Sequence, residues 1–220
     1  MPQDSAPSTF DFSQLRREYA QRALSEHDVH PNPVRQFLAW LNEAVAANAF
    51  EPNAMTLATA TVEGVPSARV VLLKQIDESG FAFFTNYLSH KARELDANPR
   101  AALVFYWPEL ERQVRVEGTV ERTSEAESEA YFHQRPRASQ IGAVASPQSE
   151  AVPSREYLEE QARALAARFP EGDIPRPSHW GGYRVRPGRI EFWQGRPNRL
   201  HDRIEYRRDG KSWAIQRLAP

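Results

Sequence analysis

The spacing of apolar residues predicts four helices. Between residues 34 and 45 apolar side chains recur with helical spacing, directly after Asn32-Pro33. Asparagine is a favoured N-cap residue and proline suits the first helical turn, so this segment is expected to form an amphipathic helix. A capping box at Ser124-Glu125-Ala126-Glu127 marks the start of another helix that runs to about residue 134. The remaining helices are expected over residues 89–97 and 158–169.

Alternating positions and short apolar runs closed by turn residues predict strands in the rest of the chain. The expected strands span residues 55–62, 67–75, 81–85, 100–107, 112–123, 182–185, 189–194, 200–207 and 212–218. Most of them are consecutive and joined by hairpin-like turns. This favours an antiparallel sheet closed as a barrel with helices outside it, over a doubly wound parallel sheet. We therefore expect an α+β fold, mainly antiparallel β, forming one domain over residues 15–220 behind a disordered tail at residues 1–14.

Composition excludes several functional classes. The chain has 28 Lys and Arg against 29 Asp and Glu, so it lacks the basic excess of a general nucleic-acid or membrane-surface binder. The absence of cysteine removes disulfides, thiolate nucleophiles and cysteine-ligated metals. The longest apolar run, residues 101–107, is far shorter than the ~20 residues that span a bilayer. The N-terminus does not resemble a secretory signal, and we expect a cytoplasmic protein.

The motifs of several common chemistries are missing. The sequence contains no G-x-G-x-x-G, no G-x-x-x-x-G-K-[ST], no G-x-S-x-G and no H-E-x-x-H. Its six histidines show no metal-ligand spacing, so no metal site is expected.

Positive charge instead gathers in places where a solvated surface does not require it. Arg69 and Lys74 bracket an apolar segment, and the alternation of a regular strand puts them on opposite faces. Snorkelling at the strand ends is the simpler explanation for this pair. Ser89-His90-Lys91 opens a predicted helix, where a lysine is unfavourable unless an anion shares the site. An exposed lysine explains that segment equally well.

Two further clusters contain donors suited to phosphate. The first is the run of residues 131–140, where the predicted helix ends among Arg, Tyr and Ser side chains. The alternative is ordinary cationic charge at a helix C-terminus. In the second, a regular strand would place Arg199, His201 and Arg203 on one face, where they repel one another unless an anion or an electron-rich ring covers them. Glu205 as counter-ion on an exposed edge is the alternative. Together the clusters indicate one or more flat, aromatic ligands that carry phosphate.

Several short segments occur together and in one order. They are RVVLLK at 69–74, FFTN at 83–86, His90-Lys91, ERQV at 111–114, YFHQRPRASQ at 131–140, Gln148-Ser149, Trp180-Gly181-Gly182, IEFWQG at 190–195 and RLHDR at 199–203. In these segments the chain resembles the pyridoxamine/pyridoxine 5′-phosphate oxidase family, colinearly from about Leu15 to the C-terminus. The resemblance implies an FMN-binding split β-barrel with peripheral helices, working as a homodimer with FMN at the subunit interface.

The resemblance also implies a reaction, the oxidation of pyridoxamine or pyridoxine 5′-phosphate to pyridoxal 5′-phosphate. Hydride passes from C4′ to flavin N5, O2 reoxidises the flavin to give hydrogen peroxide, and the amine substrate releases ammonia. The implied FMN contacts are Arg69, Val70, Val71, Leu72, Leu73, Lys74, Phe84, Thr85, His90, Lys91, Gln113, Gln148, Ser149, Trp193 and Arg203. The implied substrate contacts are Arg16, Arg17, Glu18, Tyr19, Lys74, Tyr131, Arg135, Ser139, Arg199, Leu200 and His201, with Arg199 and His201 as the catalytic residues.

Two positions depart from the family pattern. His90 stands where arginine is common, which matters because a neutral histidine donates only one hydrogen bond. Phe84 stands where tyrosine is common, which matters little if that contact is made by the backbone. Two other functions remain open at this point: a non-catalytic binder of pyridoxal phosphate, and a related flavoenzyme with another substrate. A related flavoenzyme with another substrate should lack the residues that bind the substrate phosphate. This sequence contains that set, which is Lys74, Tyr131, Arg135 and Ser139.

Overall fold

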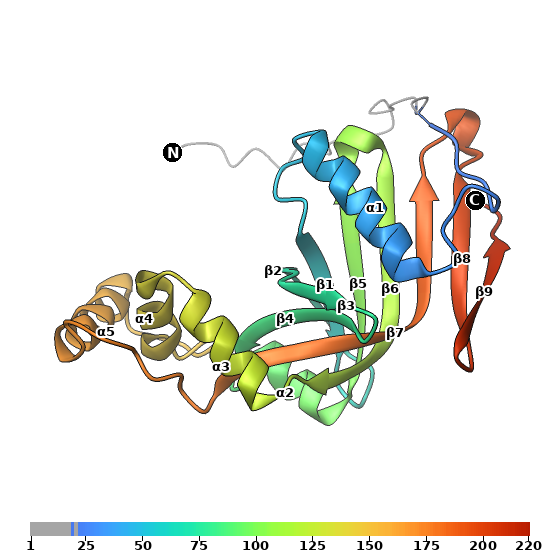
Figure 1. Cartoon of the computed structure of the whole chain (residues 1–220). Helices are drawn as coiled ribbons and strands as arrows, with labels where there is room; N and C mark the ends of the chain where they lie inside the picture. Colours follow the sequence, from blue (N-terminus) through green and yellow to red (C-terminus); the bar gives the residue numbers. More distant parts are fainter. Residues whose placement is uncertain (1–18, 20–21) are drawn as a thin grey trace, which may run out of the picture.

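The structure, a computed structural model, describes Tyr19 and residues 22–220 of the 220-residue chain (Figure 1). The helices are α1 (Pro33–Ala46), α2 (His90–Ala97), α3 (Glu125–Gln134), α4 (Arg137–Ala145) and α5 (Arg155–Arg168). The strands are β1 (Ala54–Ala60), β2 (Pro66–Leu72), β3 (Gln75–Asp77), β4 (Gly80–Asn86), β5 (Arg100–Trp107), β6 (Arg112–Arg122), β7 (Trp180–Gln194), β8 (Asp202–Asp209) and β9 (Ser212–Arg217). Two short 3₁₀ turns are η1 (Pro108–Leu110) and η2 (Pro197–Arg199).

The strands form one curled sheet in the order β2-β1-β5-β6-β7-β4-β3, with the β8–β9 hairpin added to β7. Every pairing between these strands is antiparallel. The long strand β7 holds the sheet together, because its first half pairs with β4 and its second half with β8. The predicted fold class, mainly antiparallel α+β in a split barrel with peripheral helices, is confirmed.

The inner face of the sheet and helix α1 build the main core. Strand β1 alternates between buried and half-buried residues, so Met55 and Leu57 point inward while their neighbours face out. Helix α1 begins at the expected Asn32 cap, whose side chain accepts hydrogen bonds from two backbone amides of the first turn. Its Phe37 lies edge-on against Phe105 on β5, with 4.7 Å between ring centroids. Burial of these large side chains is the main stabilising term of the barrel.

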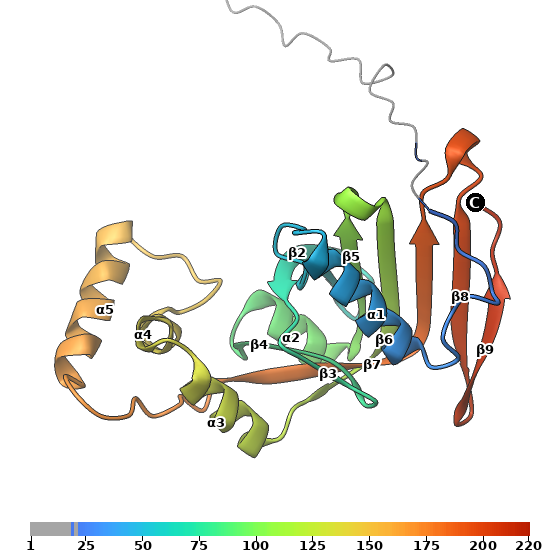
Figure 2. The same cartoon turned by 45° about the horizontal axis from the view of Figure 1, so that its top comes forward.

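Helices α3, α4 and α5 form a lobe beside the first half of β7, on the side of the sheet away from β8 and β9 (Figures 1 and 2). The capping box predicted at Ser124 is present, because its side chain accepts from the amide of Glu127 and Glu127 caps in return. A small second apolar cluster joins the lobe to the sheet through Phe132, Ile174 and Trp180.

Three strand predictions need correction. The two strands expected over residues 182–185 and 189–194 are one strand, β7. The strand expected over residues 67–75 is interrupted at Leu73 and Lys74, between β2 and β3. The strand expected from residue 200 begins only at Asp202. The preceding residues form η2, in which Asn198 and Arg199 both have a positive φ. Arg199, His201 and Arg203 therefore do not share the face of one regular strand, because the chain turns between the first and the last of them.

Two predicted features stay predictions. Residues 1–18, 20 and 21 lie outside the described part of the chain, so the tail over residues 1–14 is untested, and so is the extent of the single domain over 15–220. In the described part of the chain no helix has the length and apolar character needed to cross a membrane. The same residues contain no His, Asp and Glu cluster that could hold a metal ion.

Candidate active site

A cavity of about 860 Å³ lies between the end of β2, strand β4 and the helical lobe. Many residues of the predicted site meet there although they come from distant parts of the sequence. Those that line it are Arg69, Val70, Val71, Leu72, Lys74, Phe84, Thr85, Lys91, Tyr131, Arg135, Ser139 and Gln148. Its volume falls in the range of about 300–1,000 Å³ that is usual for cofactor and ligand pockets.

Lys91 and Arg69 form one cationic region of this cavity. The Lys91 ammonium lies within hydrogen-bond distance of Thr85 Oγ1 (3.3 Å) and Gln148 Oε1 (3.0 Å), which are neutral acceptors. Burial, and secondarily the positive charge of Arg69, lower the pKa of Lys91. Two cations that disfavour each other in a half-buried pocket point to an anionic ligand that would relieve both.

Glu94 on α2 is the buried carboxylate that contacts Arg69 in this region. Its carboxylate is 4% exposed and accepts a hydrogen bond from Thr59 (2.6 Å) and an ion pair from Arg69 (3.3 Å). The imidazole of His90 contacts the other carboxylate oxygen at 3.4 Å. His90 thus turns toward Glu94 of its own helix and does not line the cavity. It therefore does not supply to the cavity the donor that an arginine at this position, common in the family, would supply.

A second cationic region contains the four residues predicted to bind the substrate phosphate. Arg135 is the end cap of α3, and its guanidinium lies over the ring of Trp180, 4.8 Å from the ring centroid. Among the buried side-chain nitrogen and oxygen atoms of the described residues, Nη1 of Arg135 is the one without a hydrogen-bond partner. Burial lowers the pKa of Arg135 and raises that of the neighbouring Tyr131. An unsatisfied buried guanidinium nitrogen is costly, and an anionic oxygen would satisfy it.

Lys74 and Arg69 both line this cavity, although a regular strand puts the two side chains on opposite faces. The alternation continues through the end of β2, because Val71 and Leu73 pack in the main core while Val70 and Lys74 are exposed. β2 is an edge strand of the sheet, and residues of both its faces line the cavity. Leu73 points into the main core and does not line the cavity.

The remaining predicted residues form a second group on the C-terminal half of β7 and on β8. The indole of Trp193 lies 4.7 Å from the imidazole of His201, and Tyr19 packs edge-on against both at 5.7 Å. Gly195 makes this possible, since a Cβ there would lie 2.7 Å from the Tyr19 ring. The amide of Arg196 donates to Nδ1 of His201 at 3.1 Å, so a neutral imidazole carries its proton on Nε2.

Two charged residues act on this second group: Arg199 on the pKa of His201, and Glu191 on the orientation of Arg203. Burial, and after it the charge of Arg199, lower the pKa of His201. Arg203 is held by Glu191 through two hydrogen bonds of 2.8 and 3.0 Å, and not by Glu205. Register places Arg203 opposite Trp193, and Trp193 opposite Gln113, in one row across β8, β7 and β6. Gln113, Trp193 and Arg203 therefore present one surface of polar and aromatic groups.

The described residues of a single chain do not bring the two groups together. Gln113, Trp193, Arg199, His201 and Arg203 are absent from the cavity lining. Four strands separate β2 from β8 along the sheet, and the helical lobe and β8 lie on opposite sides of it (Figure 1). Leu200, 70% exposed, and Ser149, in a left-handed conformation, also lie outside the lining. Arg16, Arg17 and Glu18 fall outside the described residues.

Sequence reasoning missed part of the cavity wall. The additional lining residues are Asn86, Gln134, Pro136, Gly142, Ala143, Ser146 and Trp180. Most belong to α4 and its flanks, where the small residues of 137–145 gave no strong helical pattern. Trp180 carried a usable signal, because the Trp180-Gly181-Gly182 segment stands out in the sequence.

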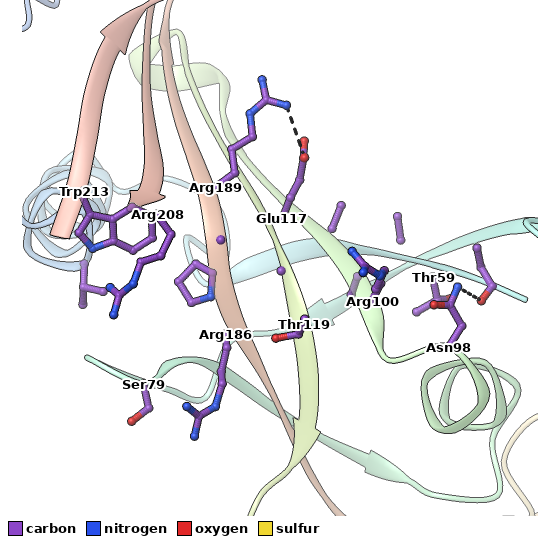
Figure 3. A pocket seen from close by; sticks show the side chains of 18 of the residues that line it. Thr59, Ser79, Asn98, Arg100, Glu117, Thr119, Arg186, Arg189, Arg208 and Trp213 are labelled. Atoms are coloured by element: carbon purple, nitrogen blue, oxygen red, sulfur yellow. Dashed lines mark hydrogen bonds and ion pairs between the residues drawn. The ribbon is translucent and has the colours of Figure 1, made fainter. Parts of the chain in front are cut away.

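A second hollow of about 830 Å³ is lined by β1, β5, β6, β7 and the β8–β9 hairpin and contains no predicted site residue (Figure 3). Two of its four arginines are ion-paired within the chain: Arg186 with Glu121 at 2.6 Å and Arg189 with Glu117 at 3.5 Å. Arg208 lies over Trp213 at 5.1 Å.

Comparison with known proteins assigns the chain to a family. A family model described as pyridoxamine 5′-phosphate oxidase matches residues 41–168, and one described as the pyridoxine 5′-phosphate oxidase C-terminal dimerisation region matches residues 180–220. Two curated relatives are named pyridoxine/pyridoxamine 5′-phosphate oxidase. The protein of Rubrobacter xylanophilus is 61% identical over 96% of this chain and 97% of its own length. The protein of a Cyanothece species is 56% identical over 96% and 100%.

Solved structures agree in fold. PhzG of Burkholderia lata, crystallised with tetrahydrophenazine-1-carboxylic acid, is 34% identical with a TM-score of 0.86, covering 91% of this chain and 99% of PhzG. A pyridoxamine 5′-phosphate oxidase-related, FMN-binding protein of Nostoc punctiforme shares the fold at a TM-score of 0.67 and 18% identity, over 86% and 98% of the two chains. On the strength of two matching models and of near full-length identity above one half, the chain is an enzyme that belongs to the pyridoxine/pyridoxamine 5′-phosphate oxidase family.

Proposed function

We propose that this protein oxidises pyridoxine 5′-phosphate and pyridoxamine 5′-phosphate to pyridoxal 5′-phosphate with FMN as its cofactor and O2 as electron acceptor. The observation that carries the proposal is a cavity with two separate cationic regions, one of which holds the unpartnered Nη1 of Arg135. One phosphate-bearing cofactor and one phosphate-bearing substrate would satisfy both regions.

The residues present fit FMN. Arg69 and Lys91 would hold its phosphate, since both cations line the half-buried pocket and the acceptors of Lys91 are neutral. The strand segment Val70–Leu72 offers backbone and apolar surface for a flat ring system. When bound, FMN would supply the redox chemistry, as acceptor of the hydride from the substrate C4′ and as donor of electrons to O2, which would yield hydrogen peroxide. No nucleophile is then required of the protein, in agreement with the missing motifs.

The chain's own residues bind and orient the substrate. Tyr131, Arg135 and Ser139 donate to the phosphate together with Lys74, which places the pyridine ring at the open side of the cavity. His201, with its proton kept on Nε2 by the Arg196 amide, is a hydrogen-bond donor to the ring substituents. Arg199 adds a fixed positive charge beside it, which stabilises negative charge on the substrate during oxidation.

We further propose that the site is completed by a second copy of the chain. The outward face of β2, β1 and β5 carries small and apolar residues in register, such as the row Ala68–Ala58–Ala102. Val70 (67% exposed) and Tyr106 (54% exposed) extend this face. An apolar sheet face of this kind is typical of a subunit interface. A homodimer would bring Trp193, His201 and Arg199 of one copy to the cavity of the other.

The function is tested by aerobic turnover of the purified, FMN-supplemented protein. Both phosphate esters should yield pyridoxal 5′-phosphate and hydrogen peroxide in equal amounts, and the amine should also yield ammonia. A second candidate follows from the similarity to PhzG, whose ligand is a reduced tricyclic carboxylic acid. Turnover of such a compound with no turnover of either phosphate ester would favour that candidate.

Changing Arg199 to alanine is expected to lower kcat about thirtyfold, because a fixed charge beside the reacting ring is lost. FMN binding should be retained, since Arg199 lies outside the cofactor cavity. Steady-state kinetics with pyridoxine 5′-phosphate and the flavin spectrum measure the two effects. Arg208→Ala is the control, because Arg208 is an exposed arginine at the other end of β8 that packs on Trp213. An unchanged kcat in the Arg199 variant would refute the catalytic role.

A further inference from the structure

The Trp180-Gly181-Gly182 segment has no role in the proposed reaction, yet it forms part of the cavity wall. Trp180 is the first residue of β7, is 5% exposed and lines the cavity. Its register partner on β4 is Asn86, and Phe132 of α3 lies edge-on against it at 5.2 Å. The indole is therefore fixed by the sheet on one side and by the helical lobe on the other.

Trp180 is the main contact that orients the Arg135 guanidinium. The guanidinium carbon lies 4.8 Å from the Trp180 ring centroid and 6.0 Å from that of Phe132. Arg135 forms no ion pair with any carboxylate of the described residues, and its Nη1 has no acceptor. A cation over an indole face is held there electrostatically, and more strongly where water is excluded.

The same indole lies parallel to the ring of Tyr131. The interplanar angle between Tyr131 and Trp180 is 9°, with 6.2 Å between centroids, and Phe84 lies near-parallel to both. Gly182 leaves room for this arrangement, because a Cβ there would lie 2.8 Å from the Phe84 ring. Three stacked rings and one arginine thus place two of the donors predicted for the substrate phosphate.

We propose that Trp180 is a positioning residue that holds Arg135 and Tyr131 in place for the substrate phosphate, and so makes the enzyme select phosphorylated substrates. This rests on the proposed function. Trp180 acts through its ring face on Arg135 and through stacking on Tyr131, and it does not touch the cationic region of Arg69 and Lys91. Its loss should therefore weaken substrate binding without weakening FMN binding.

The test compares Trp180→Leu, which removes the aromatic face, with Trp180→Phe, which keeps one. In the FMN-loaded protein the Kd of 4-deoxypyridoxine 5′-phosphate, which lacks the oxidisable C4′ hydroxyl, should rise about tenfold in the leucine variant. The phenylalanine variant should recover most of that loss. The KM for pyridoxine 5′-phosphate should rise by the same factor in the leucine variant, while kcat and the FMN Kd stay within about twofold.

Phe169→Leu is the matched control. Phe169 belongs to the same small apolar cluster and lies under Arg168 at 5.5 Å, an arginine that does not line the cavity. This variant should keep the wild-type Kd and KM. The inference is overturned if Trp180→Leu binds the probe as tightly as wild type, or if it loses FMN in parallel with the probe. A wild-type protein that binds the probe but oxidises neither phosphate ester contradicts the proposed function alone.

Discussion

Replacing Arg135 with methionine is expected to raise the KM for pyridoxine 5′-phosphate about a hundredfold, the equivalent of losing one charge-assisted, bidentate contact to phosphate. Methionine keeps much of the apolar stem but removes the guanidinium that lies over Trp180. Because Nη1 of Arg135 has no partner within the described chain, its removal breaks no internal hydrogen bond of that atom. The free energy of unfolding should therefore stay unchanged or rise slightly, since a desolvated cation is removed.

The measurement is a pair of steady-state curves with a melting temperature for each variant. Arg137→Met is the matched control two residues along, since Arg137 donates to the backbone carbonyls of Phe169 and Gly172 and lies outside the cavity lining. The control should keep the wild-type KM. A wild-type KM in the Arg135 variant would show that the phosphate binds elsewhere.

Replacing Arg69 with alanine is expected to raise the Kd for FMN about a hundredfold, because a half-buried cation that would pair with the cofactor phosphate is lost. The variant also leaves Glu94 without its arginine partner, and an uncompensated buried carboxylate is destabilising. The apo-protein should therefore melt at a lower temperature than wild type, in addition to binding FMN weakly.

Titration of the apo-protein with FMN, followed by quenching of flavin fluorescence, measures the first effect. Arg69→Lys separates it from the second, because lysine keeps the charge beside Glu94 but not the planar donor pair. That variant should regain stability and only part of the affinity. Arg93→Ala is the control, since Arg93 is exposed and donates to the carbonyl of Leu88. If Arg69→Ala binds FMN with the wild-type Kd, the FMN phosphate does not bind beside Arg69.

The order and type of most elements could be predicted from the sequence, because they depend on local signals. The caps at Asn32 and Ser124 and the turn at Asp209-Gly210 mark their elements correctly. Helix α4 was not predicted, since its small residues give little helical periodicity. Strand β7 was predicted as two strands, because Pro187 and Gly188 read as a break. In the sheet they lie where the register with β6 shifts between Glu117 and Gly118.

Twelve of the residues predicted for the site line one cavity, but the arrangement of the predicted residues could not be derived from the sequence. The sequence can indicate which residues are suited to bind phosphate or an aromatic ring. It does not give the distance between residues on β2 and β8, because that distance depends on the strand order of the whole sheet. Arg69 and Lys74 keep the alternation expected from the sequence, and both line the cavity because β2 is an edge strand, a position that no local signal marked. The single face expected for Arg199, His201 and Arg203 was lost to the turn at η2, where two residues adopt positive φ. Such departures depend on tertiary contacts and not on local propensity.

In the proposed homodimer, one active site is built from the cavity of one chain and the Arg199–His201 region of the other. Mixed dimers of Arg135→Met and Arg199→Ala test it most directly, because each mixed dimer would contain one intact site and one site with both defects. After random re-pairing of equal amounts, about half of the dimers are mixed and about a quarter of wild-type activity should return. Activity that never exceeds the mean of the two separate variants would show that the two groups act within one chain and would contradict the account.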